Sequence, residues 1–109
     1  RVEKADAREA LPEMVTRAAE AGAPVVVFHS AVVAYMAPPV RDEFAALMTG
    51  LVDAGACHWI SNEGPDVLPG VTATAPRPPP QGFFVTALDG RAVAWSRGHG
   101  GEMRAVEDA

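Results

Sequence analysis

Lysine and cysteine are almost absent from this 109-residue sequence, and each shortage excludes a class of protein. Lysine occurs once, at Lys4, the arginines are scattered, and the formal net charge at pH 7 is −5. Because nucleic-acid binding requires clustered Lys and Arg side chains, we expect no nucleic-acid partner. Cys57 is the only cysteine, which excludes a disulfide framework and favours a reducing, cytoplasmic location.

Charged residues are missing altogether from residues 21–40, a stretch as long as a membrane-spanning helix. Pro24, Pro38 and Pro39 interrupt this stretch, so we expect no membrane span. Paired metal-ligand spacings such as His-x-x-x-His or Cys-x-x-Cys are also missing, and we expect no metal site. The chain opens at Arg1 without an initiator methionine or a signal-peptide pattern, which indicates a fragment of a larger domain.

Hydrophobic periodicity predicts an α/β chain with two main helices. The first covers residues 11–21, and the second begins at Pro38 and ends at Gly55. Runs of β-branched and aromatic residues predict strands at residues 25–29, 57–61, 83–88 and 92–96. The first of these is apolar on both faces, as in a parallel sheet covered by helices. Asp89-Gly90 predicts that the last two strands form an antiparallel hairpin.

Two segments carry no helical or strand periodicity. Residues 64–82 are rich in Pro, Gly and Thr, which predicts a long loop that is either mobile or functional. Within it, Arg77 followed by Pro78 offers a polyproline motif to a partner module, and a stiff loop is the alternative. Residues 101–109 form a polar tail. From its length, we expect residues 1–109 to be a single domain or a fragment of one.

Polar residues follow both predicted parallel strands, His29-Ser30 after the first and Asn62-Glu63 after the second. Because the carboxyl ends of parallel strands meet at one edge, we expect these residues to share a ligand cleft, with Tyr35 as a further candidate. Glu63 would act as a base or bind a ligand hydroxyl, and the alternative is a simple turn. Nucleophilic catalysis by Ser30 is not expected, because His29 points to the opposite face and the Gly-x-Ser-x-Gly motif is absent.

Three stretches, FHSAVVAYM, WISNEGP and ALDGRAVAWSRGHG, resemble the C-terminal part of a bacterial family catalogued as domain of unknown function 2332. The chain is more distantly similar to class I S-adenosylmethionine-dependent methyltransferases. That similarity implies the C-terminal half of a Rossmann-like, three-layer domain whose cofactor contacts Asp6-Ala7 and His29-Ser30. It also implies that strand 92–96 lies between strands 57–61 and 83–88 and runs antiparallel to both.

The Gly-rich loop that carries the amino-acid part of that cofactor is absent, as is the acidic residue that binds its ribose. The resemblance therefore implies no cofactor in these residues alone and S-adenosylmethionine in the full-length protein. Two functions stay open, part of a methyltransferase-like enzyme with a small-molecule ligand, or a non-catalytic binding or interaction module of the same fold. Strand 25–29 would have an unpaired edge, which predicts a homo-oligomer formed through that edge.

Overall fold

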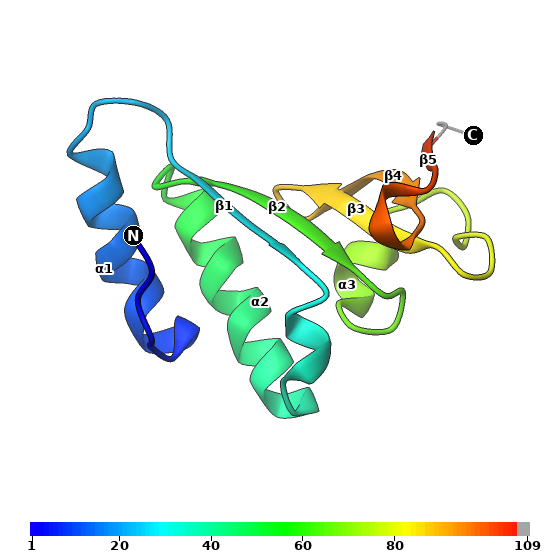
Figure 1. Cartoon of the computed structure of the whole chain (residues 1–109), viewed down its shortest axis with the longest axis horizontal. Coiled ribbons are helices and arrows are strands. Elements are labelled where there is room, and N and C mark those ends of the chain that lie inside the picture. Colours follow the sequence, from blue (N-terminus) through cyan, green and yellow to red (C-terminus); the bar gives the residue numbers. More distant parts are fainter. Residues whose placement is uncertain (107–109) are drawn as a thin grey trace.

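A computed structural model, described here for residues 1–106, confirms that the chain is mixed α/β (Figure 1). It has a five-stranded sheet and three helices, where four strands and two main helices were predicted. The helices are α1 (Ala7–Ala19), α2 (Pro38–Asp53) and the short α3 (Pro69–Thr72). The strands are β1 (Val26–Ser30), β2 (His58–Glu63), β3 (Phe84–Leu88), β4 (Arg91–Ser96) and β5 (Met103–Ala105). Single 3-10 turns lie at Val33–Tyr35 and Gly98–Gly100.

The strands cross the sheet in chain order, from β1 to β5. β1 and β2 are parallel, as predicted, and each later pair of neighbours is antiparallel. The strand order implied by the resemblance to methyltransferases, with residues 92–96 beside β2, is wrong because β3 occupies that place. Asp89 explains the difference, since its N–H donates to the Trp59 carbonyl at 2.7 Å and its carboxylate accepts the Trp59 N–H at 2.8 Å. These bonds hold the end of β3 against β2.

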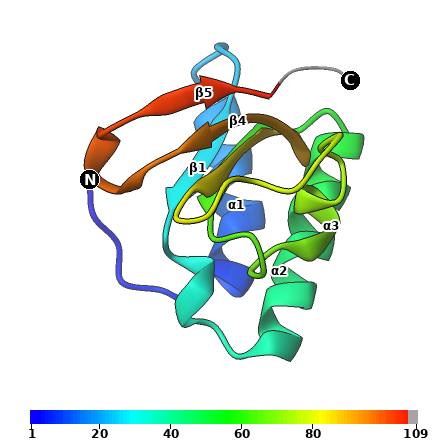
Figure 2. The ribbon, with the colours of Figure 1, turned by 90° about the vertical axis from the view of Figure 1, so that its right-hand side faces the viewer.

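α2 and α3 pack on one face of the sheet, and α1 lies beside α2 at the β1 edge (Figures 1 and 2), so the described residues form two layers rather than the implied three. Strand side chains alternate between the faces. Those that point to the helices are buried, such as Trp59 and Val85, which are 1% and 4% exposed. On the other face Phe28 is 78% exposed and Ile60 39%. Toward β4 this open face is more closed, since Ala94 and Ser96 are 7% and 6% exposed.

The core lies between the sheet and the helices. Trp59 is at its centre, with its ring centroid 6.4 Å from that of Phe44 on α2. Burying one aromatic side chain of this size contributes about 1.5–3 kcal/mol to folding. The larger members of this core are Val15, Val33, Phe44, Met48, Trp59, Leu68, Val71, Phe83, Val85 and Trp95.

α1 begins earlier than the predicted residue 11, because Asp6 caps it. The Asp6 carboxylate accepts the N–H of Arg8 at 2.9 Å, which satisfies one of the unpaired donors at the start of the helix. Pro12 consequently lies inside the helix. The helix ends at Ala19, and Gly22 follows with a positive φ of 78°, a conformation that glycine adopts without strain.

The segment predicted as a loop contains α3, and the predicted polar tail contains β5. α3 forms where Pro69 opens a turn, and the Thr72 hydroxyl donates to the Pro65 carbonyl at 2.7 Å. Thr74 then accepts the N–H of Ala92 at 2.8 Å, which fastens this segment to β4. Residues 107–109 of the tail lie outside the described residues. No helix between residues 1 and 106 has the length and apolar character needed to cross a bilayer.

Candidate functional site

The carboxyl ends of β1 and β2 lie side by side, which brings together four residues predicted to share a cleft. Ser30 is opposite Asn62 in the parallel register, and Glu63 follows on β2. Because successive strand residues point to opposite faces, His29 and Glu63 turn toward the helices. Ser30 and Asn62 turn toward the open face. The sheet therefore divides the predicted cleft into a buried pair and an open pair.

His29 and Glu63 form the buried pair. His29 Nδ1 lies 2.7 Å from Glu63 Oε2, and the two side chains are 8% and 2% exposed. The indole N–H of Trp59 donates to His29 Nε2 at 2.9 Å. Since Nε2 accepts, the neutral imidazole carries its proton on Nδ1 and donates it to Glu63. Both ring nitrogens are therefore used inside the protein, and neither is left for a ligand.

The Glu63 carboxylate also holds the loop that follows β1. It accepts the backbone N–H of Val32 at 3.1 Å and that of Ala34 at 3.3 Å. Ala31 starts this loop with a positive φ of 52°, and the turn that follows is the Val33–Tyr35 3-10 turn. A buried carboxylate with three donors is the arrangement expected of a group that stabilises the fold. In this position Glu63 is only 2% exposed, and its carboxylate is already engaged by three protein donors.

On the open face, hydroxyl and amide groups form a row across β1, β2, β3 and β4. Asn62 donates to Ser30 Oγ at 3.0 Å and accepts from the Thr86 hydroxyl at 2.9 Å and the Ser96 hydroxyl at 2.7 Å. Thr86 and Ser96 lie 3.0 Å apart. Thr86 and Ser96 were not among the residues predicted from the sequence. The only sequence signal was a lone hydroxyl residue in each hydrophobic run, and its meaning depends on the strand register.

This row forms one wall of a groove of about 520 Å³. Asn62 donates one amide hydrogen to Ser30, so its second amide hydrogen and the Ser30 hydroxyl hydrogen remain as donors for a ligand. Arg97 also lines the groove, and its guanidinium stacks on Phe83 at 4.5 Å and donates to Glu102 at 3.2 Å. The rest of the lining is Phe84, Thr86, Ser96, Gly98, His99, Gly100 and Met103.

The residues implied to contact an adenine ring, Asp6 and Ala7, lie at the start of α1. Arg8 donates to the Asp6 carboxylate from its side chain and its backbone, and these bonds lower the pKa of Asp6. Arg8 also donates to Glu43 on α2 at 2.6 Å, which joins the two helix starts. Neither Asp6 nor Ala7 lines the groove on the open face.

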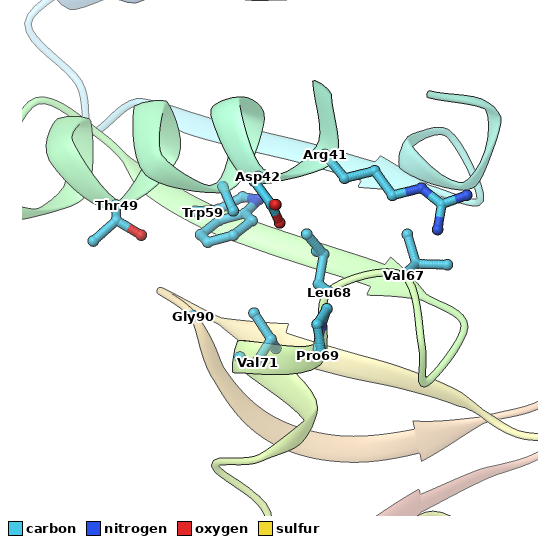
Figure 3. Close-up of a pocket in the computed structure, with 11 residues that line it drawn as sticks. Arg41, Asp42, Thr49, Trp59, Val67, Leu68, Pro69, Val71 and Gly90 are labelled. Carbon is cyan, nitrogen blue, oxygen red and sulfur yellow. The ribbon is translucent and has the colours of Figure 1, made fainter. Parts of the chain in front are cut away.

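Tyr35 is 91% exposed and does not line the groove. A separate pocket of about 320 Å³ lies on the helix side of the sheet, between α2 and the segment that forms α3 (Figure 3). Asp42 lies near the Trp59 ring in this pocket, opposite Leu68. Arg41, at one end, donates to the backbone carbonyls of residues 34 and 36. No residue of this pocket was predicted from the sequence to bind a ligand.

At the opposite, amino edge of the parallel pair, His58 and Asp89 form a more exposed contact. His58 Nδ1 lies 3.0 Å from Asp89 Oδ2. The N–H of Trp59, followed by the bond to His58, lowers the pKa of Asp89. Burial raises the pKa of the nearby Cys57 thiol. The described residues contain no group of three or more His, Cys, Asp or Glu side chains arranged to hold a metal ion.

Comparison with known proteins gives one match, to a family. No curated protein matches the chain, and no solved structure matches it. Residues 1–109 match the model of a family described as an uncharacterized protein conserved in bacteria, DUF2332. The match confirms the first of the two resemblances, and the similarity to methyltransferases stays a prediction. Since the family model covers all 109 residues, the chain belongs to the DUF2332 family of bacterial proteins.

Proposed function

We propose that this chain binds a small polar molecule in the open-face groove at the carboxyl ends of β1 and β2. The observation that carries the proposal is the Ser30–Asn62 pair, which presents two unused hydrogen-bond donors beside the apolar side chains Phe84 and Met103. Such a lining suits a ligand with carbonyl, hydroxyl or carboxylate oxygens on a partly apolar body. Ligands commonly bind at this edge of α/β sheets.

For the full-length protein we propose S-adenosylmethionine as that ligand, by way of a methyltransferase-like domain. In support, α1, β1, α2 and β2 follow in the order of that fold, and the two parallel strands end in polar residues. Two features limit the contribution of these residues. The cofactor's Gly-rich loop is missing from the sequence, and β3 takes the place beside β2. We therefore expect the 109-residue chain alone to bind S-adenosylmethionine weakly or not at all.

A non-catalytic binding module is the second candidate. The observation in its favour is the burial of Glu63, the base of the predicted cleft, together with its partner His29. His29 and Glu63 are both engaged by protein groups, so neither side chain is in a position to exchange protons with a ligand in the groove. The groove still offers hydrogen-bond donors for binding.

Replacement of Asn62 by leucine tests the groove. The substitution removes the donor and acceptor groups that join Ser30, Thr86 and Ser96. In calorimetric titration of the full-length protein with S-adenosylmethionine, we expect affinity to fall roughly tenfold or more. Thr49→Val, in the pocket of Figure 3, is the matched control and should leave the affinity unchanged.

Equal loss of affinity in both variants would show that the ligand does not bind in the groove. If the unaltered full-length protein releases no heat, the methyltransferase-like proposal fails. In that case the groove is tested by following the amide signals of Ser30 and Asn62 during titration with adenosine and with methionine. Shifts confined to the groove support the non-catalytic module, and their absence contradicts small-molecule binding by either compound.

A further inference from the structure

The two edges of the sheet differ in their protection against pairing with another strand. At one edge, β5 has three residues and carries Arg104, with Glu102 just before it. Short length and charge are the usual ways in which proteins protect an edge. At the other edge, β1 has five residues and contains no charge and no proline. β1 is therefore the edge that is open to association.

The outward hydrogen-bonding groups of β1 follow from its pairing with β2. The Val25 carbonyl accepts the N–H of His58 at 2.8 Å, and the Ala31 N–H donates to the Asn62 carbonyl at 2.9 Å. In a parallel ladder alternate residues bond to the same neighbour, so the odd-numbered residues of this strand face β2. The N–H and C=O groups of Val26, Phe28 and Ser30 point away from the sheet, and Phe28 is the middle of the three.

An apolar trough runs along the same edge. α1 lies outside β1, beyond the edge of the sheet (Figure 1). Between them is a trough of about 290 Å³, lined by Leu11, Met14, Val15 and Ala18 of α1 and by residues 25–28. Met14 is 40% exposed and Phe28 78% exposed. The edge thus combines unpaired backbone groups with exposed apolar side chains and no charge.

We propose that a second copy of this chain pairs with β1 through β1 of its own, antiparallel and about a two-fold axis at Phe28. The outward groups are self-complementary in this arrangement, because Phe28 lies opposite Phe28 of the partner subunit and Val26 lies opposite the partner subunit's Ser30. Each of these pairs exchanges both backbone hydrogen bonds. The absence of charge in β1 lets two chains of net charge −5 meet there without local repulsion.

Sedimentation velocity of the 109-residue chain at tens of micromolar tests this inference, and we expect a dimer. Phe28→Lys places a charge at the axis on a side chain that is already exposed, and should raise the dissociation constant roughly tenfold or more. Ile60→Lys is the matched control, since Ile60 lies on the same open face but on the interior strand β2. This variant should remain a dimer.

A monomeric unaltered chain would overturn the proposal, as would an equal loss of dimer in both variants, which indicates stacking of the open faces. Circular dichroism melting of each variant shows whether it is folded. If Phe28→Lys does not fold, hydrogen exchange of the unaltered chain decides. Pairing predicts that the amides of Val26, Phe28 and Ser30 become protected as concentration rises, and unchanged exchange contradicts it.

Discussion

Replacing Glu63 by alanine is expected to lower the free energy of unfolding by about 3–5 kcal/mol, the usual cost of removing one partner from a buried polar network. Glu63 is 2% exposed and accepts hydrogen bonds from His29 Nδ1 and from the backbone of Val32 and Ala34. Without the carboxylate, three donors lose their partner at a nearly fully buried position. Urea unfolding followed by tryptophan fluorescence measures the change.

Glu13→Ala is the control for this variant. Glu13 is an exposed residue of α1, and its removal should leave the urea midpoint nearly unchanged. A small domain has only about 5–15 kcal/mol of total stability, so Glu63→Ala should stand close to unfolding at room temperature. A midpoint equal to that of the unaltered chain would mean that Glu63 does not hold the loop after β1.

Trp59 is expected to show the other large effect. Trp59→Ala should cost about 3–5 kcal/mol, because it leaves a cavity at the centre of the core. Trp59→Phe keeps much of the apolar surface but removes the indole N–H that donates to His29. It should lower the free energy of unfolding by about 1–3 kcal/mol beyond the cost of the lost apolar area.

Trp95→Phe separates the cost of the lost apolar area from the cost of the lost indole hydrogen bond. Trp95 is 2% exposed, so phenylalanine removes a similar apolar area there. The Trp95 indole makes no hydrogen bond to any described residue, and only surface burial should be lost. Thermal unfolding of the two Trp→Phe variants therefore isolates the Trp59–His29 bond. Equal losses of stability would contradict a role for that bond.

The parts of the fold that the sequence predicts are those with local causes. The amphipathic pattern of α2 and the Asp89-Gly90 turn act over a few residues, and both elements formed as predicted. The sheet order depends on contacts between distant segments. Asp89 forms a hydrogen bond with Trp59, thirty residues away. The hairpin pattern alone does not predict which of its two strands pairs with β2. The same reason explains why the one-sided packing of the helices was not predicted.

The sequence predicts that four polar residues lie together, but it does not predict their orientation. The carboxyl ends of β1 and β2 do bring His29, Ser30, Asn62 and Glu63 together. Strand alternation separates them into two pairs, a consequence of the period-two rule that holds for any strand. The burial of His29 and Glu63 depends on Trp59 and on the loop after β1, and neither contact has a signature in local sequence.

The central claim is that the carboxyl edge is divided, with His29 fixed inside the protein and the groove of Ser30 and Asn62 open on the other face. Nitrogen-15 NMR of the His29 imidazole at neutral pH tests this most directly. A ring that donates to Glu63 and accepts from Trp59 must carry its proton on Nδ1 and leave Nε2 bare. A ring protonated on Nε2, or one that averages rapidly between the two forms, would contradict the account.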